Sequence, residues 1–341
     1  MGTLMESVVD PDRAEQLLGE GRLHDLSCRS AQAMACYAAV IELSSDARLQ
    51  AEALRRLGVL HHLRAEPEVA RELCERSCDV ALEAGAPELA ADAFNALGGF
   101  ALERGDLIEA AESYHHALEL AAERIGLVAK IEQNLGIVAN IQGQWAKALA
   151  HYSRSLAAYE AGGDSRGCAY AHHNLGMIHA DQKQWSDADR HYQTSQALAA
   201  AAGDRHLGGL ALMNRAEVRL AQGDLEGARA GAEQALAIFS EVDARRHKAG
   251  AHRLLGMVFR QRGQPALAES HLRSALEIAA GASCPLTEAD AAKELATLYQ
   301  SERRRGDALS YLMLARELYS QLNAAADLVD VDQRIGLLQV A

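Results

Sequence analysis

The sequence is organised around the stretch His173-Asn174-Leu175-Gly176, which is followed by Ala188 and Tyr192, twelve and sixteen residues after the glycine. The same frame returns about every forty residues in both directions. We call its Gly or Ala the landmark residue. The eight landmark residues, each with the Ala twelve positions later, are Gly21 and Ala33, Gly58 and Ala70, Gly98 and Ala110, Gly136 and Ala148, Gly176 and Ala188, Ala216 and Ala228, Gly256 and Ala268, and Ala296 and Ala308. One frame at a nearly constant period predicts a solenoid of helix hairpins, in which each unit packs on its neighbours.

A small landmark residue indicates a close contact between the two helices of each hairpin. Glycine inside a helix costs about 1 kcal/mol relative to alanine, yet six of the eight copies carry it. We therefore expect the first helix of each hairpin to approach the second at a point where neither helix carries a large side chain. The Ala twelve residues on is the facing small residue. The Tyr four residues further lies on the same helix face and is expected to fill the space beside the contact. These tyrosines are Tyr37, Tyr114, Tyr152 and Tyr192.

Turn residues between the repeats predict where the helices begin and end. Arg104-Gly105-Asp106 and Gln222-Gly223-Asp224 each place a glycine after one helix and an aspartate N-cap before the next. Asp10-Pro11 has the residues of a helix start. Gly336 lies forty residues after Ala296 and indicates one further first helix. The predicted organisation is a short N-terminal arm over 1–9, eight hairpins over 10–323 and a C-terminal capping helix over 324–341.

Leu-Gly, a helix-breaking turn, and then Ala and an aromatic residue resemble the tetratricopeptide repeat. The period is mostly forty residues, longer than the usual 34. This long form is similar to the repeats of spindle-orientation adaptors, kinesin light chains and bacterial peptide-sensing regulators. The resemblance implies an all-α, right-handed superhelical solenoid whose first helices line an inner groove. It also implies that the groove binds peptides or protein segments.

Composition bears on the possible partners and the compartment. The net charge is −13 and the longest basic run is Arg303-Arg304-Arg305, so we expect no nucleic-acid partner. No apolar stretch approaches a membrane span, and the first ten residues lack the features of a secretory signal. Six cysteines without paired spacing favour a reducing, cytoplasmic compartment. The strong excess of Arg over Lys and the abundant Ala favour a bacterial source.

Two residue pairs have a spacing that could support chemistry. Cys74 and Cys78 share a helix face, which suits either a metal site or apolar packing, and packing is favoured because Cys74 takes a position that Tyr fills in other repeats. Cys168 and His172 share a face too, but a nucleophile and its base need an orienting third group, and the sequence offers none. We therefore expect no catalytic residue, no metal, no cofactor and no enzymatic activity.

The candidate binding residues lie on the first helices, at positions that face the groove in the resembling family. Asn134, Asn174 and Asn214 recur two residues before their landmarks. By resemblance, such an Asn grips the backbone of an extended bound peptide; the alternative is that it caps local backbone. The complete candidate set is Asn134, Asn174, Asn214, Asn95, Gln133, Lys130, Asn140, Tyr170, His173, Met177, Met213, Arg55, Arg56 and Arg253.

Two functions follow from this reading. The first is an adaptor or regulatory scaffold that holds an extended segment of a partner protein in the groove. The alternative is a structural scaffold that self-assembles through its ends or its convex face, which leaves a homo-oligomer open.

Overall fold

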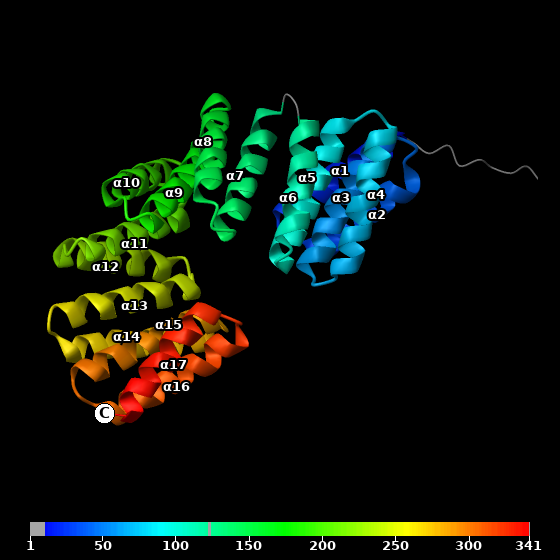
Figure 1. Cartoon of the computed structure of the whole chain (residues 1–341). Coiled ribbons are helices and arrows are strands. Elements are labelled where there is room, and N and C mark those ends of the chain that lie inside the picture. The colour runs from blue at the N-terminus through cyan, green and yellow to red at the C-terminus, as the bar shows by residue number, and fades with distance from the viewer. Residues whose placement is uncertain (1–10, 122–123, 341) are drawn as a thin grey trace, which may run out of the picture. The chain divides into compact units, whose positions relative to one another are not determined.

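The chain is an all-α repeat structure, as predicted (Figure 1). A computed structural model describes residues 11–121 and 124–340, and these ranges contain seventeen α-helices and no strand. The helices are α1 (Pro11–Leu26), α2 (Ser30–Leu43), α3 (Ala47–Leu63), α4 (Pro67–Glu83), α5 (Pro87–Arg104), α6 (Leu107–Ala121), α7 (Ile125–Ile141), α8 (Trp145–Ala161), α9 (Ser165–Asp181), α10 (Trp185–Ala201), α11 (Arg205–Ala221), α12 (Leu225–Glu241), α13 (Arg245–Gln261), α14 (Pro265–Gly281), α15 (Pro285–Ser301), α16 (Arg305–Gln321) and α17 (Ala325–Val340). The predicted arm over 1–9 and the cap at Asp10 lie outside the described residues.

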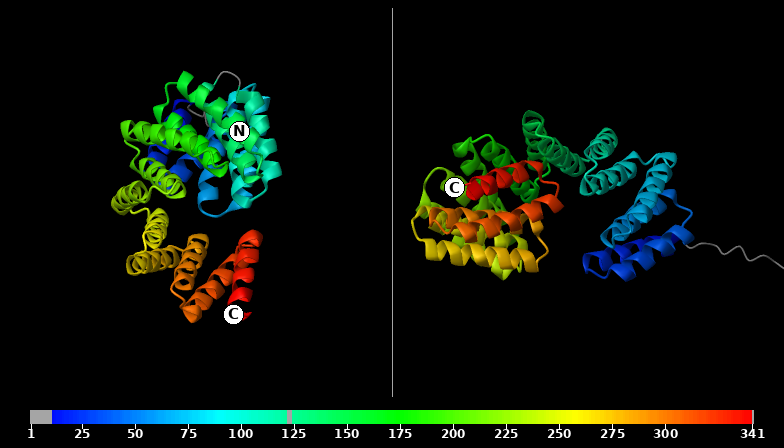
Figure 2. Two further views of the ribbon diagram at one scale, coloured as in Figure 1. Left: turned by 60° about the vertical axis from the view of Figure 1, so that its left-hand side comes forward. Right: turned by 60° about the horizontal axis from the view of Figure 1, so that its bottom comes forward.

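Each odd-numbered helix packs most extensively against the even-numbered helix that follows it, which makes eight hairpins, and α17 packs on α16. The chain divides into two compact units, one ending at Asp164 and the other beginning at Ser165. Within each unit the hairpins lie side by side (Figure 2). No described helix has both the length and the apolar character that crossing a membrane requires.

The turns follow the predicted chemistry. Gly105 and Gly223 adopt left-handed backbone, with φ of 82° and 83°; Gly105 directly follows α5, and Gly223 follows α11 after one intervening residue. The next residue in each case is an aspartate whose carboxylate accepts a backbone N–H of the following helix. The backbone N–H of Glu109 donates to Asp106 at 3.0 Å, and that of Gly227 donates to Asp224 at 2.9 Å. A glycine and an aspartate together therefore reverse the chain in three residues.

The tyrosine, rather than the alanine, explains why the landmark residue is glycine. A Cβ atom on Gly176 would lie 2.7 Å from Tyr192 Cε1, and one on Gly136 would lie 2.5 Å from Tyr152 Cε1. The ring thus lies directly on the glycine, where we had expected it beside the contact. At Gly58 the same place is taken by Cys74. The side chains sixteen residues after the landmarks are buried and fill the contact between the two helices of each hairpin.

First helices of neighbouring repeats also contact one another within each unit. In the first unit these contacts join α1 with α3, α3 with α5, and α5 with α7. In the second unit they join α9 with α11, α11 with α13, and α13 with α15. Second helices make no comparable contact in the described ranges, so each unit curves toward its first helices. The side of the first helices is therefore the inner face of each unit.

Candidate functional site

The inner face of the first unit contains a cleft of about 680 Å³ between α3, α5 and α7. Arg55, Asn95 and Lys130, which come from three successive first helices, all line it. The structure therefore brings together three of the predicted binding residues. The other lining residues are Val59, Asp92, Ala96, Arg124, Ile125, Gly126, Leu127 and Asp164.

Arg55 is the distinctive group of this cleft. Its side chain is half-buried, and the guanidinium makes no hydrogen bond or ion pair with any residue in the described ranges. Burial lowers the pKa of Arg55, while the charge of Asp92 opposes that shift. Asp92 itself accepts a hydrogen bond from Arg124 at 2.6 Å. The cleft thus holds an unpaired cation beside the polar side chains of Asn95 and Lys130.

The amide of Asn95 is partly committed to a neighbour. Asn134 donates through Nδ2 to Asn95 Oδ1 at 3.1 Å, which joins α7 to α5. This bond leaves the Asn95 NH₂ group as a donor and the Asn134 carbonyl oxygen as an acceptor. The two asparagines can therefore still pair with a peptide bond.

The remaining predicted residues of the first unit take other roles. Arg56 donates to Glu52 at 2.7 Å and lies 3.9 Å from Asp25, so it ties α3 to α1. Gln133 accepts from the Tyr159 hydroxyl at 3.4 Å. Asn140 is half-buried near the end of α7.

In the second unit, His173 is the centre of the asparagine contacts. Asn214 Nδ2 lies 3.1 Å from His173 Nε2, which joins α11 to α9. Burial lowers the pKa of His173, and a hydrogen bond with Asn174 opposes the shift. A neutral His173 can accept the Asn214 N–H on Nε2, so this histidine orients both asparagines.

Charged and polar side chains continue along the same face. Arg253 donates to Glu217 at 3.3 Å. Burial raises the pKa of Glu217, Arg253 opposes this shift, and the nearby Asp290 adds to it. The Tyr170 hydroxyl donates to Asp204 at 3.3 Å.

The two predicted methionines contribute to packing. Met177 packs against a buried cluster that contains Tyr192 and Val218. Met213 packs among the residues around Leu254 and Phe239. Both remain half-buried, so their outer atoms still border the inner face.

The candidate binding set omits Asp92 and Arg124, although the sequence places Asp92 among the acidic residues of the groove. Asp92 lies six residues before its landmark Gly98, the offset at which Lys130, Tyr170 and Asp290 also occur. Arg124 directly precedes α7 and lies twelve residues before its landmark Gly136, the offset at which Asp164 and Asp204 precede their helices. The frame therefore indicates a helix start at this position but not that its residue borders the cleft.

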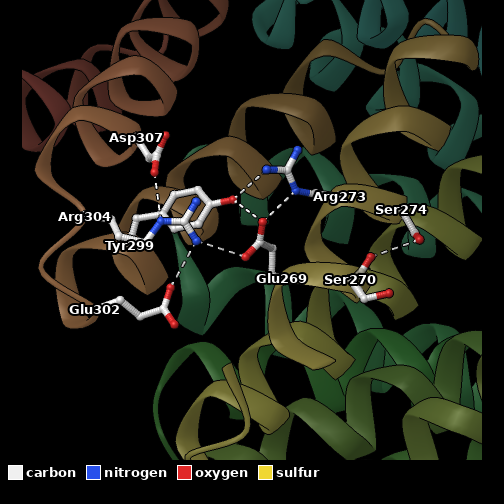
Figure 3. Close-up of polar contacts among 8 residues, drawn as sticks. All are labelled: Glu269, Ser270, Arg273, Ser274, Tyr299, Glu302, Arg304 and Asp307. Atoms are coloured by element: carbon white, nitrogen blue, oxygen red, sulfur yellow. Dashed lines mark hydrogen bonds and ion pairs between the residues drawn. The ribbon is translucent and has the colours of Figure 1, made fainter. Parts of the chain in front are cut away.

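A second polar cluster joins α14 to α15 and α16 and is satisfied internally (Figure 3). The Tyr299 hydroxyl donates to Glu269 at 2.8 Å and accepts from Arg273 at 2.9 Å. Arg304 stacks 4.1 Å from the Tyr299 ring centre and donates to Asp307 at 2.8 Å and to Glu269 at 3.2 Å. Hydrogen bonds from Tyr299, Arg273 and Arg304 hold the pKa of Glu269 low. Because its donors and acceptors satisfy one another, this cluster serves to join the hairpins.

Cys74 and Cys78 are both buried, and burial raises the pKa of each thiol to about 12. No group of three or more His, Cys, Asp or Glu side chains that could hold a metal occurs in the described part of the chain.

The two buried thiols are expected to resist alkylation. Iodoacetamide at pH 8 should modify the exposed Cys28 at least about a hundredfold faster than Cys74 or Cys78, because the thiolate is the reactive form. Peptide mass mapping over time measures the three rates. Equal rates, or stoichiometric zinc in the purified protein, would contradict this reading.

Comparison with known proteins gives one family and several similar folds. A family model described as tetratricopeptide repeat matches residues 89–161, 127–201 and 209–280. No curated protein matches the chain.

Three solved structures are similar to it. A signal transduction ATPase with numerous domains and a tetratricopeptide repeat sensor, from Pyrococcus horikoshii, has a TM-score of 0.64 and 15% identity, covering 98% of this chain and 56% of that one. A Rap protein complexed with competence and sporulation factor has a TM-score of 0.62 and 15% identity, covering 97% and 98%. Aspartyl phosphate phosphatase F from Bacillus subtilis has a TM-score of 0.58 and 14% identity, covering 99% and 96%. At these identities the likeness concerns the fold.

Proposed function

The chain belongs to the tetratricopeptide repeat family, whose model covers more than half of it, and from this premise we propose that it is a protein-binding scaffold. It acts as an adaptor or regulator that holds an extended segment of a partner on the inner face of its first helices. The Rap protein similar in fold was solved with competence and sporulation factor, which shows that such a fold is compatible with a bound factor. The phosphatase named above shares only the fold, and we expect no catalysis by this chain.

The observation that carries the proposal is the cleft of the first unit. Arg55, Asn95 and Lys130 converge there, and the Arg55 guanidinium has no partner among the described residues. Asp92 acts on Arg55 only through its charge, because its carboxylate accepts the hydrogen bond of Arg124. Holding a guanidinium half out of water without a hydrogen-bond acceptor is unfavourable. A bound segment with a carbonyl or carboxylate oxygen would supply that missing partner.

The spacing of the asparagines fits an extended peptide. Neighbouring packed helices lie about 8–10 Å apart, and an extended chain advances about 3.3 Å per residue. One repeat therefore matches roughly three peptide residues. Asn95 and Asn134 would each pair with a peptide bond of one ligand, since an amide side chain both donates and accepts. Asn174 and Asn214 lie on the corresponding inner face of the second unit, as do His173 and Arg253.

Replacing the cleft side chains is expected to weaken binding without unfolding the protein. The probe is the tightest ligand selected from a library of random twelve-residue peptides by the full chain. The triple variant Arg55→Ala, Asn95→Ala and Lys130→Ala should bind it about tenfold to a thousandfold more weakly, because each lost contact costs roughly 0.5–1.5 kcal/mol, or more where it is charged. Calorimetric titration gives the two dissociation constants.

Arg76→Ala is the matched control, because Arg76 is an exposed arginine on α4, a second helix. Its affinity should equal that of the unaltered chain, and all variants should keep the same circular dichroism spectrum. Equal affinity in the triple variant would mean that the ligand binds elsewhere.

A further inference from the structure

The last helix, α17, has the position of a first helix but an open face. In every preceding first helix the residue seven positions before the landmark is a buried Ala or Gly. These residues are Ala14, Ala51, Ala91, Ala129, Ala169, Gly209, Ala249 and Ala289. The equivalent residue of α17 is Val329, which is 57% exposed.

The landmark residue of α17 is likewise uncovered. At the six landmark glycines of the earlier repeats, an added Cβ would lie 2.4–2.7 Å from the side chain sixteen residues later. At Gly336 no heavy atom lies within 4 Å of that position. No second helix therefore covers α17 in the described ranges. Gly336 lacks the contact with a second-helix side chain that each of the earlier landmark glycines makes.

Helices α16 and α17 line a cleft of about 740 Å³ beside this face. Met313 lies in the lining and is 58% exposed. The equivalent residue in the preceding repeat is Arg273 on α14. Arg304, which directly precedes α16, donates to Glu269 in the polar cluster that contains Arg273, and so covers that position (Figure 3). At α16 the equivalent position is apolar and open, so it suits an apolar side chain of an incoming helix.

The charges around the cleft indicate the chemistry of that helix. Glu317, Asp330 and Asp332 are exposed acidic residues, and two bases lie beside them: Arg316 donates to Asp332 at 2.7 Å and Arg334 lies 4.0 Å from Asp330. The acids still outnumber the bases, and Glu317 makes no ion pair with any described residue. A basic helix is therefore attracted to this edge. A second copy of the chain is disfavoured, because each copy carries a net charge of −13.

We propose that the exposed face of α17, with Val329 and Gly336 at its centre, is a docking site for a basic amphipathic helix of a partner protein. That helix inserts one aromatic ring or leucine over Gly336. Its apolar stripe covers Val329 and Met313, and its Lys or Arg side chains face Glu317 and Asp330. This surface is separate from the cleft at Arg55 and extends the proposed scaffold by a second binding mode.

The probe for this site is a fluorescein-labelled peptide with the sequence of residues 145–161. In the chain this segment is α8, whose Tyr152 covers Gly136 and which carries the basic residues Lys147 and Arg154. Anisotropy should show saturable binding to the full chain. The same peptide with Tyr152→Ala should bind at least about tenfold more weakly.

Gly336→Ala separates docking from folding. The added methyl group meets no atom in the free chain, so the melting temperature should stay the same or rise. Peptide affinity should fall at least about tenfold, because the methyl group occupies the place of the ring. Gly306→Ala on α16, which also has no neighbour within 4 Å, should leave the affinity unchanged.

Three outcomes would overturn the proposal. They are the absence of saturation at millimolar peptide, equal affinity of the Gly336→Ala variant, and growth of the free protein in light scattering that Gly336→Ala abolishes. The last result would assign the face to a second copy. Arg55→Ala with Lys130→Ala should leave the affinity for this peptide unchanged, so a failure of docking and a failure of the inner cleft are distinguishable.

Discussion

Gly176→Ala is expected to lower the free energy of unfolding by about 1–3 kcal/mol, the usual cost of overpacking a filled core. The added methyl group would lie 2.7 Å from Tyr192 Cε1, closer than carbon atoms approach. The ring is buried within its hairpin and cannot swing into solvent. The loss should exceed the roughly 1 kcal/mol that alanine gains over glycine inside a helix. Urea denaturation followed by circular dichroism gives the value.

Gly208→Ala is the control for this substitution. Gly208 lies in α11, and no heavy atom lies within 4 Å of its added Cβ. The change should stabilise the protein by roughly 0.5–1 kcal/mol, because alanine restricts the unfolded chain. A second variant, Tyr192→Leu, reproduces the pair of Ala296 and Leu312 in the last repeat. In that background Gly176→Ala should cost less; an unchanged cost would show that the tyrosine is not the obstacle.

Acidification from pH 7 to pH 4.5 is expected to destabilise the second unit before the first. His172 and His191 face each other with their Nδ1 atoms 2.9 Å apart, and His252 and His271 do so at 3.0 Å. Both pairs occupy the same two positions of the repeat frame. Burial, with the charge of the partner histidine, lowers the pKa of His191 and of His252 to about 4. Two protonated rings cannot share one hydrogen bond, so each pair requires at least one neutral ring.

The direction of the effect follows from proton binding. An unfolded histidine has a pKa of about 6.5. Between that pH and about 4 the unfolded chain binds more protons than the folded one, so stability falls as the pH falls through this window. We expect about 1 kcal/mol per pair, because the rings are partly exposed and solvent screens the charge. The raised pKa values of Glu217 and Asp181 act in the opposite sense and offset part of the loss.

The first unit should respond at a lower pH. Its equivalent pair is Glu132 and His151, with Glu132 Oε2 2.7 Å from His151 Nδ1. Hydrogen bonds from His151 and Arg154 outweigh burial and hold the pKa of Glu132 below its usual value. Its contribution is complete above the unfolded pKa of about 4.3 and is lost only as the pH falls below that value.

The two tryptophans allow the units to be followed separately. Trp145 lies in α8 and Trp185 in α10, one in each unit, so Trp145→Phe and Trp185→Phe give single-tryptophan reporters. Urea midpoints at pH 7 and pH 4.5 should fall more for the reporter at Trp185. Replacing His252 and His271 by Leu, as at Leu54 and Leu73 of the second repeat, should reduce that difference. Equal shifts for the two reporters would refute the assignment to the histidine pairs.

The sequence by itself determined the repeat, the hairpins and the turns. These features depend on backbone chemistry and on helical periodicity, both of which local residues encode. Gly105 with Asp106 reverses the chain wherever that pair follows a helix. Gly176 with Tyr192, repeated at a constant offset, requires two helices in close contact. The sequence also indicated the candidate residues Arg55, Asn95 and Lys130, but only as members of a longer set.

Only the tertiary structure decided which side chains meet. It placed the Tyr192 ring on Gly176 itself, joined Asn134 to Asn95, and left Arg55 without a partner in a cleft that Arg124 borders. It also showed that Gly336, identical in the frame to the other landmark glycines, is uncovered. Spacing along the chain specifies the helix face on which a residue lies. The partner of a side chain depends on its rotamer and on the distance to the next helix, which arise only when the hairpins pack.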